Sequence, residues 1–306
     1  MAYLYRPPLP NLTKTFDYLP SRDGLALQVG GANRVTSRTG YIADVAANPT
    51  HVWQPRLDQN AYAGFISTAK GQNNQDLGHH HWQADPEYVF SNGYKPLTID
   101  GSDNLRIRAQ RTSTVSPAFQ AGEVPNDPNT GGAFEFVTGL VTTKDGFSQR
   151  GGYWEIDAKV PVGTAAWPAF WMYPQGESLG VHIPEIDILE IFGGEPGYAV
   201  TDWYNNAIGN GYVGDSNKIS SGVDMSLSFH KWGFEHTQTA LRFYLDGTLV
   251  ATKNVSSRPE FWTPLYLIMS MQIGSRIGGW VPAPSAGTPD PADILVRSVR
   301  AWQFRS

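Results

Sequence analysis

The stretch Ala240-Leu241-Arg242-Phe243-Tyr244-Leu245-Asp246-Gly247-Thr248-Leu249-Val250-Ala251-Thr252 carries the clearest fold signal in the chain. Leu241, Phe243 and Leu245 recur at every second position, as in a strand with one buried face. An Asp-Gly pair that follows such a run is typical of a two-residue hairpin turn. Residues 240–252 therefore predict two antiparallel strands joined by a tight turn.

Other segments extend this pattern. Residues 104–110 and 153–160 also alternate with period two, and residues 265–273 are apolar on both faces, as in a central strand between two layers. The 22 Pro and 32 Gly interrupt the chain too often for long helices. We expect an all-β fold with two stacked antiparallel sheets, a β-sandwich or jelly roll.

Composition excludes several classes of protein. The net charge is −5 without a Lys/Arg run, which argues against nucleic-acid binding. The chain has no Cys, so disulfides and thiol catalysis are excluded. No apolar run approaches the roughly 18 residues of a membrane helix, and residues 1–12 do not resemble a signal peptide. With 10 Trp and 14 Tyr, the surface suits stacking on sugar rings.

No linker or internal repeat divides the chain. We expect an N-terminal elaboration over residues 1–60, packed on a catalytic sandwich over residues 61–306. Residues 59–85 and 113–132 are polar and rich in Gly and Asn, and they predict long loops. His79-His80-His81 lies in the first loop, and we expect no metal there because three consecutive side chains cannot face one point.

The segment Pro184-Glu185-Ile186-Asp187-Ile188-Leu189-Glu190-Ile191-Phe192 concentrates acidic residues. In a strand, Glu185 and Asp187 share one face while the isoleucines point to the core. A regular strand would bury Glu190 with the isoleucines, which is costly for a carboxylate. A one-residue β-bulge near Leu189 would return Glu190 to the face of Glu185.

An ordinary surface strand with outward acids is the alternative interpretation. It is weak here because like charges side by side repel, and no local cation compensates for them. Crowded carboxylates raise one another's pKa, so one can be ionised while another is protonated near neutral pH. The segment is therefore a candidate two-carboxylate catalytic site.

This segment resembles the Glu-x-Asp-x-x-Glu signature of glycoside hydrolase family 16 in its bulged form. Its surroundings are similar to the family in the same order, from about residue 104 to residue 303. The matching stretches include Trp167-Pro168-Ala169-Phe170-Trp171, Phe229-His230-Lys231-Trp232-Gly233 and Phe243-Tyr244-Leu245-Asp246-Gly247. The resemblance implies a concanavalin-like jelly roll and a retaining endo-β-glycanase.

Carried over by position, the resemblance makes Glu185 the nucleophile and Glu190 the general acid and base, with Asp187 tuning Glu185. It implies a polysaccharide substrate, contacted by Trp167, Trp171, Trp203, Gln272 and Trp280. Trp171 could equally be a core residue. Many members bind calcium through an Asp of the last strand, where this chain has Arg297, so we expect no metal and no cofactor.

Several alternatives stay open. The substrate we favour is a bacterial exopolysaccharide or capsule, and β-1,3-glucan of the laminarin type is the runner-up. A transglycosylase would use the same carboxylates. A non-catalytic carbohydrate-binding protein or a virion component belongs to a different class. We expect a monomer that acts outside the cell or on a particle.

Overall fold

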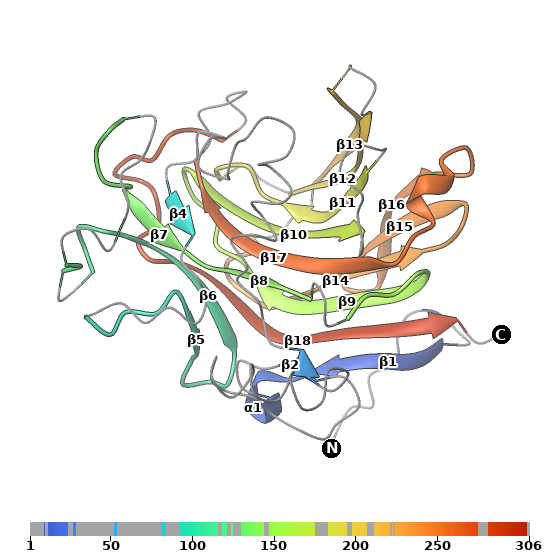
Figure 1. The fold of residues 1–306 in the computed structure, drawn as a ribbon, viewed down its shortest axis with the longest axis horizontal. Coiled ribbons are helices and arrows are strands. Elements are labelled where there is room, and N and C mark those ends of the chain that lie inside the picture. The colour runs from blue at the N-terminus through green and yellow to red at the C-terminus, as the bar shows by residue number, and fades with distance from the viewer. Residues whose placement is uncertain are drawn as a thin grey trace.

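The computed structural model describes the chain mainly from residue 92 onward. The described residues are 9, 12–23, 27–28, 52–53, 81–83, 92–115, 118–120, 124, 130–143, 147–174, 183–194, 198–206, 211–220, 222, 224–274 and 281–304. Figure 1 shows the strands of one sheet curving over those of the other. The prediction of an all-β sandwich is confirmed.

The smaller sheet has six strands in the order β13-β12-β11-β10-β17-β8. All of its pairs are antiparallel, and β11 and β10 lie at its centre. The strands are β8 (Leu140–Thr142), β10 (Ala166–Pro174), β11 (Ile183–Glu190), β12 (Tyr198–Asn206), β13 (Gly211–Ile219) and β17 (Leu265–Ile273). Every residue of β17 is buried, as expected for a central strand.

The larger sheet has ten strands, eight of them in the order β16-β15-β14-β9-β18-β6-β7-β4, with β1 paired to β18 and β5 paired to β6. The pairing of β4 with β7 is parallel. The strands are β1 (Leu12–Tyr18), β4 (His81–Gln83), β5 (Leu97–Ile99), β6 (Leu105–Arg111), β7 (Phe136–Thr138), β9 (Gly152–Lys159), β14 (His230–His236), β15 (Ala240–Leu245), β16 (Thr248–Asn254) and β18 (Ala292–Phe304).

The remaining elements are short. β2 (Leu27–Gln28) and β3 (Val52–Trp53) pair with each other, and the helices are α1 (Pro20–Asp23) and the 3₁₀ turn η2 (Pro259–Phe261). In the part of the chain that the structure describes, neither helix is long and apolar enough to span a membrane. β1 is hydrogen-bonded to the last strand, and the division of the chain at residue 60 stays a prediction.

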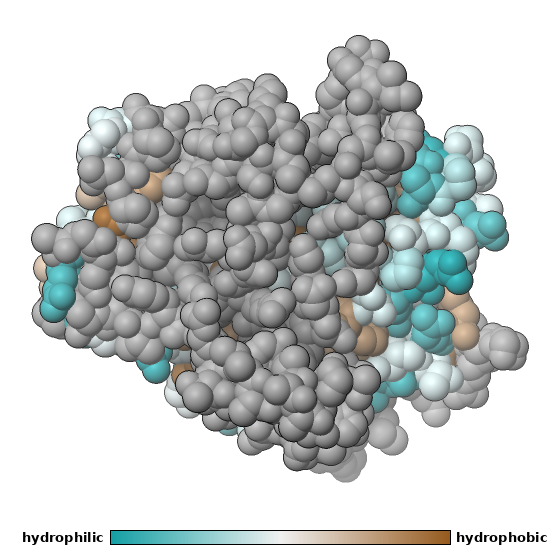
Figure 2. Space-filling model, in the orientation of Figure 1, coloured by the Kyte–Doolittle hydropathy of each residue, from teal (hydrophilic) through white to brown (hydrophobic). Residues whose placement is uncertain are grey.

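The predicted hairpin turn is confirmed by the register of β15 and β16. Leu245 pairs with Thr248, which leaves Asp246 and Gly247 as the two turn residues. Their φ angles are 49° and 82°, and two consecutive positive φ values are what this class of turn requires. The described surface beside β15 and β16 is mainly hydrophilic on the face shown in Figure 2.

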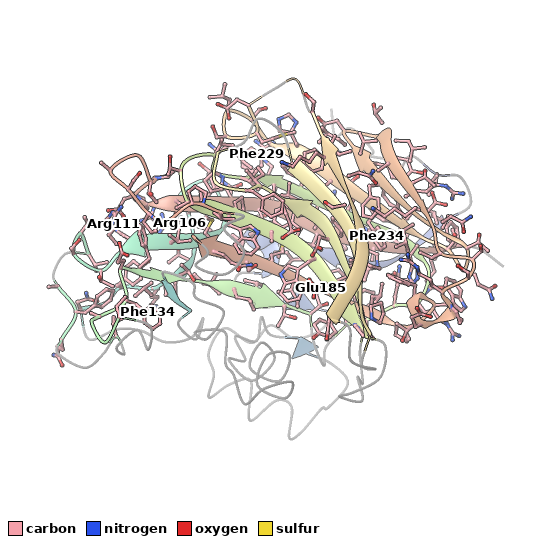
Figure 3. The ribbon with its side chains drawn as sticks, turned by 90° about the horizontal axis from the view of Figure 1, so that it is seen from above. Arg106, Arg111, Phe134, Glu185, Phe229 and Phe234 are labelled. Carbon is pink, nitrogen blue, oxygen red and sulfur yellow. The ribbon has the colours of Figure 1, made fainter. Side chains whose placement is uncertain are left out.

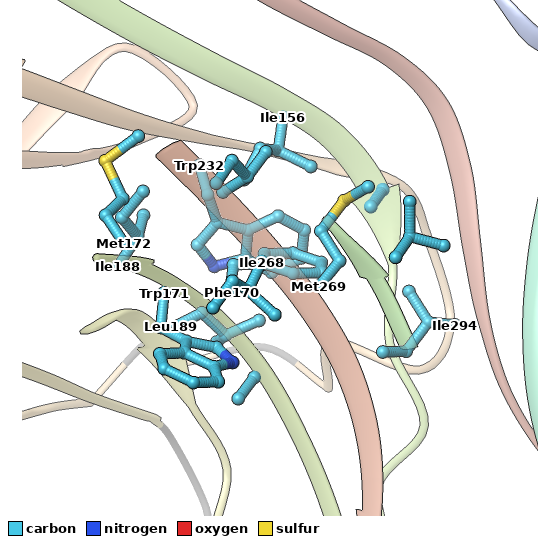
Figure 4. Close-up of a cluster of buried hydrophobic side chains, with 14 of the residues drawn as sticks. Ile156, Phe170, Trp171, Met172, Ile188, Leu189, Trp232, Ile268, Met269 and Ile294 are labelled. Carbon is cyan, nitrogen blue, oxygen red and sulfur yellow. The ribbon is translucent and has the colours of Figure 1, made fainter. Parts of the chain in front are cut away.

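The core lies between the sheets. Phe170 of the small sheet meets Trp232 of the large sheet edge to face, with ring centroids 5.6 Å apart, and both side chains are buried. Figure 4 shows Met269, Ile156 and Ile188 around this pair. Burying a side chain of this size stabilises the fold by about 2 kcal/mol. Because the inner face of β10 and β11 is anchored here, their alternate residues must point to the outer face of the small sheet.

Candidate active site

A β-bulge interrupts β11 between Asp187 and Glu190. Along β10, Asp187 pairs with Trp171 and Leu189 pairs with Phe170, so Ile188 is the extra residue on that side. The register with β12 shifts between the same two residues. The bulge predicted near Leu189 is therefore present.

The bulge sorts the side chains of β11 between two faces. Ile186, Ile188 and Leu189 are all buried in the core cluster. Glu185 and Asp187 occupy alternate positions on the opposite face, and the extra residue returns Glu190 to it. Glu185 and Glu190 are partly exposed while Asp187 is buried. The structure thus brings the three predicted carboxylates to one face of the small sheet.

Partial burial raises the pKa of both glutamates by removing water from their carboxyls. For Glu185, loss of hydration is the main cause, and the charge of Glu190 raises its pKa further. For Glu190, loss of hydration also raises the pKa, while a hydrogen bond from Trp167 opposes it. Arg106 and Arg111 lie well to the left of Glu185 in Figure 3, and neither is among the groups that shift these two pKa values. The two carboxyls interact, so their two titration steps belong to the pair, and they can share one proton at neutral pH.

Trp167 supplies a hydrogen bond to one of these carboxyls. The indole N–H of Trp167 donates to Glu190 Oε1 over 3.1 Å. Glu185 Oε2 is buried and has no hydrogen-bond partner among the described residues. A buried acceptor without a donor is costly, which is tolerated at sites where a ligand supplies the donor.

A polar chain borders the carboxylates on β10 and β17. Trp171 Nε1 donates to Ser270 Oγ over 3.2 Å, and Gln272 Nε2 donates to the same oxygen over 3.3 Å. Gln272 Oε1 is buried without a partner in the described part of the chain. Trp167 pairs with Gln272 and Trp171 pairs with Ile268. Trp167, Trp171 and Gln272 therefore lie on the same face as the carboxylates.

The sequence analysis did not single out Ser270. It lies in an apolar strand, and its position two residues before Gln272 could have shown that both share a face. Trp203 pairs with Glu185 through the backbone, and its side chain is outside the described residues. Trp280, His79 and His80 also lie outside them. His81 begins β4, which pairs with β7 at the end of the large sheet.

A second polar chain, Ser228, His230 and Asp246, lies at the large sheet. His230 Nε2 is 2.9 Å from Ser228 Oγ, and His230 Nδ1 is 2.8 Å from Asp246 Oδ2. This is the order of a nucleophile, a base and an orienting acid. A nucleophilic serine also needs free backbone N–H groups beside it to stabilise an oxyanion. The adjacent N–H of Leu227 is already bonded to the carbonyl of Asp224. We therefore assign these three residues a structural role, in which they hold the turn at Asp246 against the start of β14.

The position at which the resemblance implies a calcium ligand carries a cation, Arg297. Arg297 is the extra residue where the register of β18 on β9 shifts, between Val296 and Ser298. Its guanidinium lies 3.6 Å from the ring centroid of Phe229. A second cation would be repelled there, so the residues at this position do not fit a calcium ion.

The chain is similar in sequence to known proteins. The family model described as glycosyl hydrolases family 16 matches residues 91–289. A curated relative, the endo-1,3-1,4-beta-glycanase EglC of Rhizobium meliloti, is 28% identical over 255 residues, 83% of this chain and 48% of its own length. Glucan endo-1,3-beta-glucosidase A1 of Niallia circulans is 26% identical over 72% of this chain and 35% of its own length. The chain spans about half or less of the length of these relatives.

Solved structures share the fold. The laminarinase catalytic domain of Thermotoga maritima superposes with a TM-score of 0.60 at 24% identity, covering 78% of this chain and 89% of that one. The endo-beta-1,3-glucanase of Pyrococcus furiosus gives 0.59 at 25% identity, covering 78% and 86%. The family model covers well over half of the sequence. The chain belongs to glycosyl hydrolase family 16.

Proposed function

We propose that the protein is a retaining endo-β-glycanase that hydrolyses internal bonds of a β-linked polysaccharide. The observation that carries this proposal is the β-bulge of β11, which puts Glu185 and Glu190 on one face with interacting carboxyls. Burial keeps one of them protonated near neutral pH, which a two-carboxylate mechanism needs. The family and the printed activities of the curated relatives support the same reaction.

Two steps complete the reaction. In the first, Glu185 attacks the anomeric carbon, the bond to the leaving sugar oxygen breaks, and Glu190 gives that oxygen its proton. In the second, Glu190 takes a proton from water, the water oxygen bonds to the anomeric carbon, and the ester to Glu185 breaks. Asp187 is buried and lies between the two glutamates on β11, where its carboxyl tunes Glu185. The product keeps the β configuration.

The substrate we favour is a bacterial exopolysaccharide or capsule with a β-linked backbone. Its support is the resemblance to a curated endo-1,3-1,4-beta-glycanase from a bacterium over 83% of this chain. β-1,3-Glucan is the second candidate, since another relative is named as a glucan endo-1,3-beta-glucosidase. A polysaccharide does not cross a cell membrane unaided, so we place the site of action outside the cell or on a particle.

The experiment is a depolymerisation assay on laminarin, lichenan, agarose, carrageenan and several bacterial exopolysaccharides. The wild type should release reducing ends from one of them, with the β anomer formed first in NMR spectra. Glu185→Gln should lower turnover at least about a thousand-fold without changing the fold. Glu135→Gln, a surface acid paired with Arg111 on the large sheet, is the matched control and should keep turnover.

Each outcome has a clear meaning. Glu185→Gln with wild-type turnover would overturn the assignment of the nucleophile. The α anomer as first product would overturn retention. If the protein binds a polymer but releases no reducing ends from any of them, the non-catalytic alternative is favoured, a carbohydrate-binding protein or virion component.

A further inference from the structure

The contact between Trp167 and Glu190 has a chemical direction. An indole N–H is a donor only, so the oxygen that it binds must act as an acceptor. Trp167 Nε1 lies 3.1 Å from Glu190 Oε1. In a protonated carboxyl group the carbonyl oxygen is the better acceptor, so the proton belongs on the other oxygen, Oε2.

We infer that Trp167 is a positioning residue that holds Glu190 Oε1 as an acceptor and so confines the transferable proton to Glu190 Oε2. This inference rests on the proposed function, in which Glu190 is first an acid and then a base. The same oxygen then gives its proton to the leaving sugar and takes one from water. When Glu190 becomes a carboxylate, the N–H of Trp167 stays bonded to it and stabilises the negative charge.

Packing holds the indole in place for this role. Trp167 is 8% exposed, and its ring lies 6.0 Å from that of Phe192. On β10, Ala169 pairs with Glu190, and Trp167 is two residues away, a diagonal neighbour on the same face. Without the bulge, Glu190 would point into the core and the contact could not form.

Few charged groups compete with this contact. Glu185 and Asp187 share β11 with Glu190. β10 and β17 contain no acidic or basic residue. β12 puts Ala199 opposite Glu190, and its acidic residue, Asp202, pairs with Ile186. Among the described residues, Trp167 is the donor that reaches Glu190, so its removal should act directly on the titration of Glu190.

Trp167→Phe tests the inference, because it keeps an aromatic ring and removes the N–H. Trp171→Phe is the matched control, since that indole lies on the same strand and face but donates to the neutral Ser270 hydroxyl. The first readout is the NMR titration of ¹³C-labelled Glu carboxyls, with the Glu190 signal assigned by its loss in Glu190→Gln. The pKa of Glu190 should rise by about one unit in Trp167→Phe and stay unchanged in Trp171→Phe.

The second readout is kinetic. The alkaline limb of kcat/KM should move to higher pH in Trp167→Phe, because Glu190 keeps its proton longer. The loss of rate should be greater on the polysaccharide than on an aryl glycoside whose leaving group needs no proton. A structural role alone would lower both rates equally and leave the limb in place.

The outcomes separate the two proposals. An unchanged Glu190 titration in Trp167→Phe, or an equal change in Trp171→Phe, overturns the inference even if the wild type is an active glycanase. A wild type that cleaves no polymer or aryl glycoside overturns the proposed function and the catalytic half of the inference. The NMR titration then still decides whether Trp167 controls the proton of Glu190.

Discussion

His236 should make the stability of this protein depend on pH between about 6.5 and 4. The imidazole is fully buried, and burial lowers its pKa from 6.5 to about 4, with the bond to the Phe261 carbonyl opposing the change. Nδ1 accepts the N–H of Gly151 over 3.1 Å, and Nε2 lies 2.8 Å from the Phe261 carbonyl. Protonation at Nδ1 would break the bond to Gly151, so the fold selects neutral imidazole.

The magnitude follows from the two pKa values. Each pH unit between them is worth about 1.4 kcal/mol, so the full gap from 6.5 to about 4 corresponds to about 3 kcal/mol. Because the folded-state pKa is lowered, this stability is fully present above pH 6.5. It is lost as the pH falls toward 4, where the unfolded chain binds a proton and the folded chain does not.

Urea unfolding at pH 4.5, 5.5, 6.5 and 7.5 measures this effect. His236→Gln keeps an acceptor and a donor but does not titrate, so it is the comparison. The wild type should lose about 1 kcal/mol or more per pH unit relative to the variant below pH 6.5. Parallel curves for the two proteins would refute the reasoning. The result also shows how much of any acidic loss of activity is unfolding and how much is titration of Glu185 and Glu190.

Four further substitutions test packing and binding. Phe170→Ala should lower the free energy of unfolding by about 3–5 kcal/mol in a denaturant titration, because it opens a cavity against Trp232. Gly152→Ala should lower the unfolding free energy by about 3 kcal/mol or more, since φ is +97° and a Cβ would overlap the Trp302 carbonyl oxygen. Gly247→Ala, with φ +82° and open space, should cost about 1 kcal/mol, and equal losses would contradict this account. Gln272→Leu should raise KM several-fold with a smaller change in kcat, and an unchanged KM would remove Gln272 from the binding site.

The fold class and the bulge could be predicted from the amino-acid sequence. Alternation in residues 240–252 and the Asp246-Gly247 pair require antiparallel strands, because period two is a property of a single chain in extended form. Glu185 and Glu190 are an odd number of residues apart, so a regular strand would bury Glu190 in the core. Burying a carboxylate is costly whichever strands lie beside it, so the spacing predicts a bulge. Neither prediction depends on which strands pair with these segments.

The groups that contact the carboxylates could not be predicted without the arrangement of the strands. The N–H of Trp167 reaches Glu190, and Ser270 joins Trp171 to Gln272, because β10 lies between β11 and β17 in the sheet. Strand order and register depend on how the faces of all six strands pack over the core, and no single segment contains that information. The proton position that we infer for Glu190 is a consequence of this arrangement, because a hydrogen bond across strands forms only once the sheet is complete.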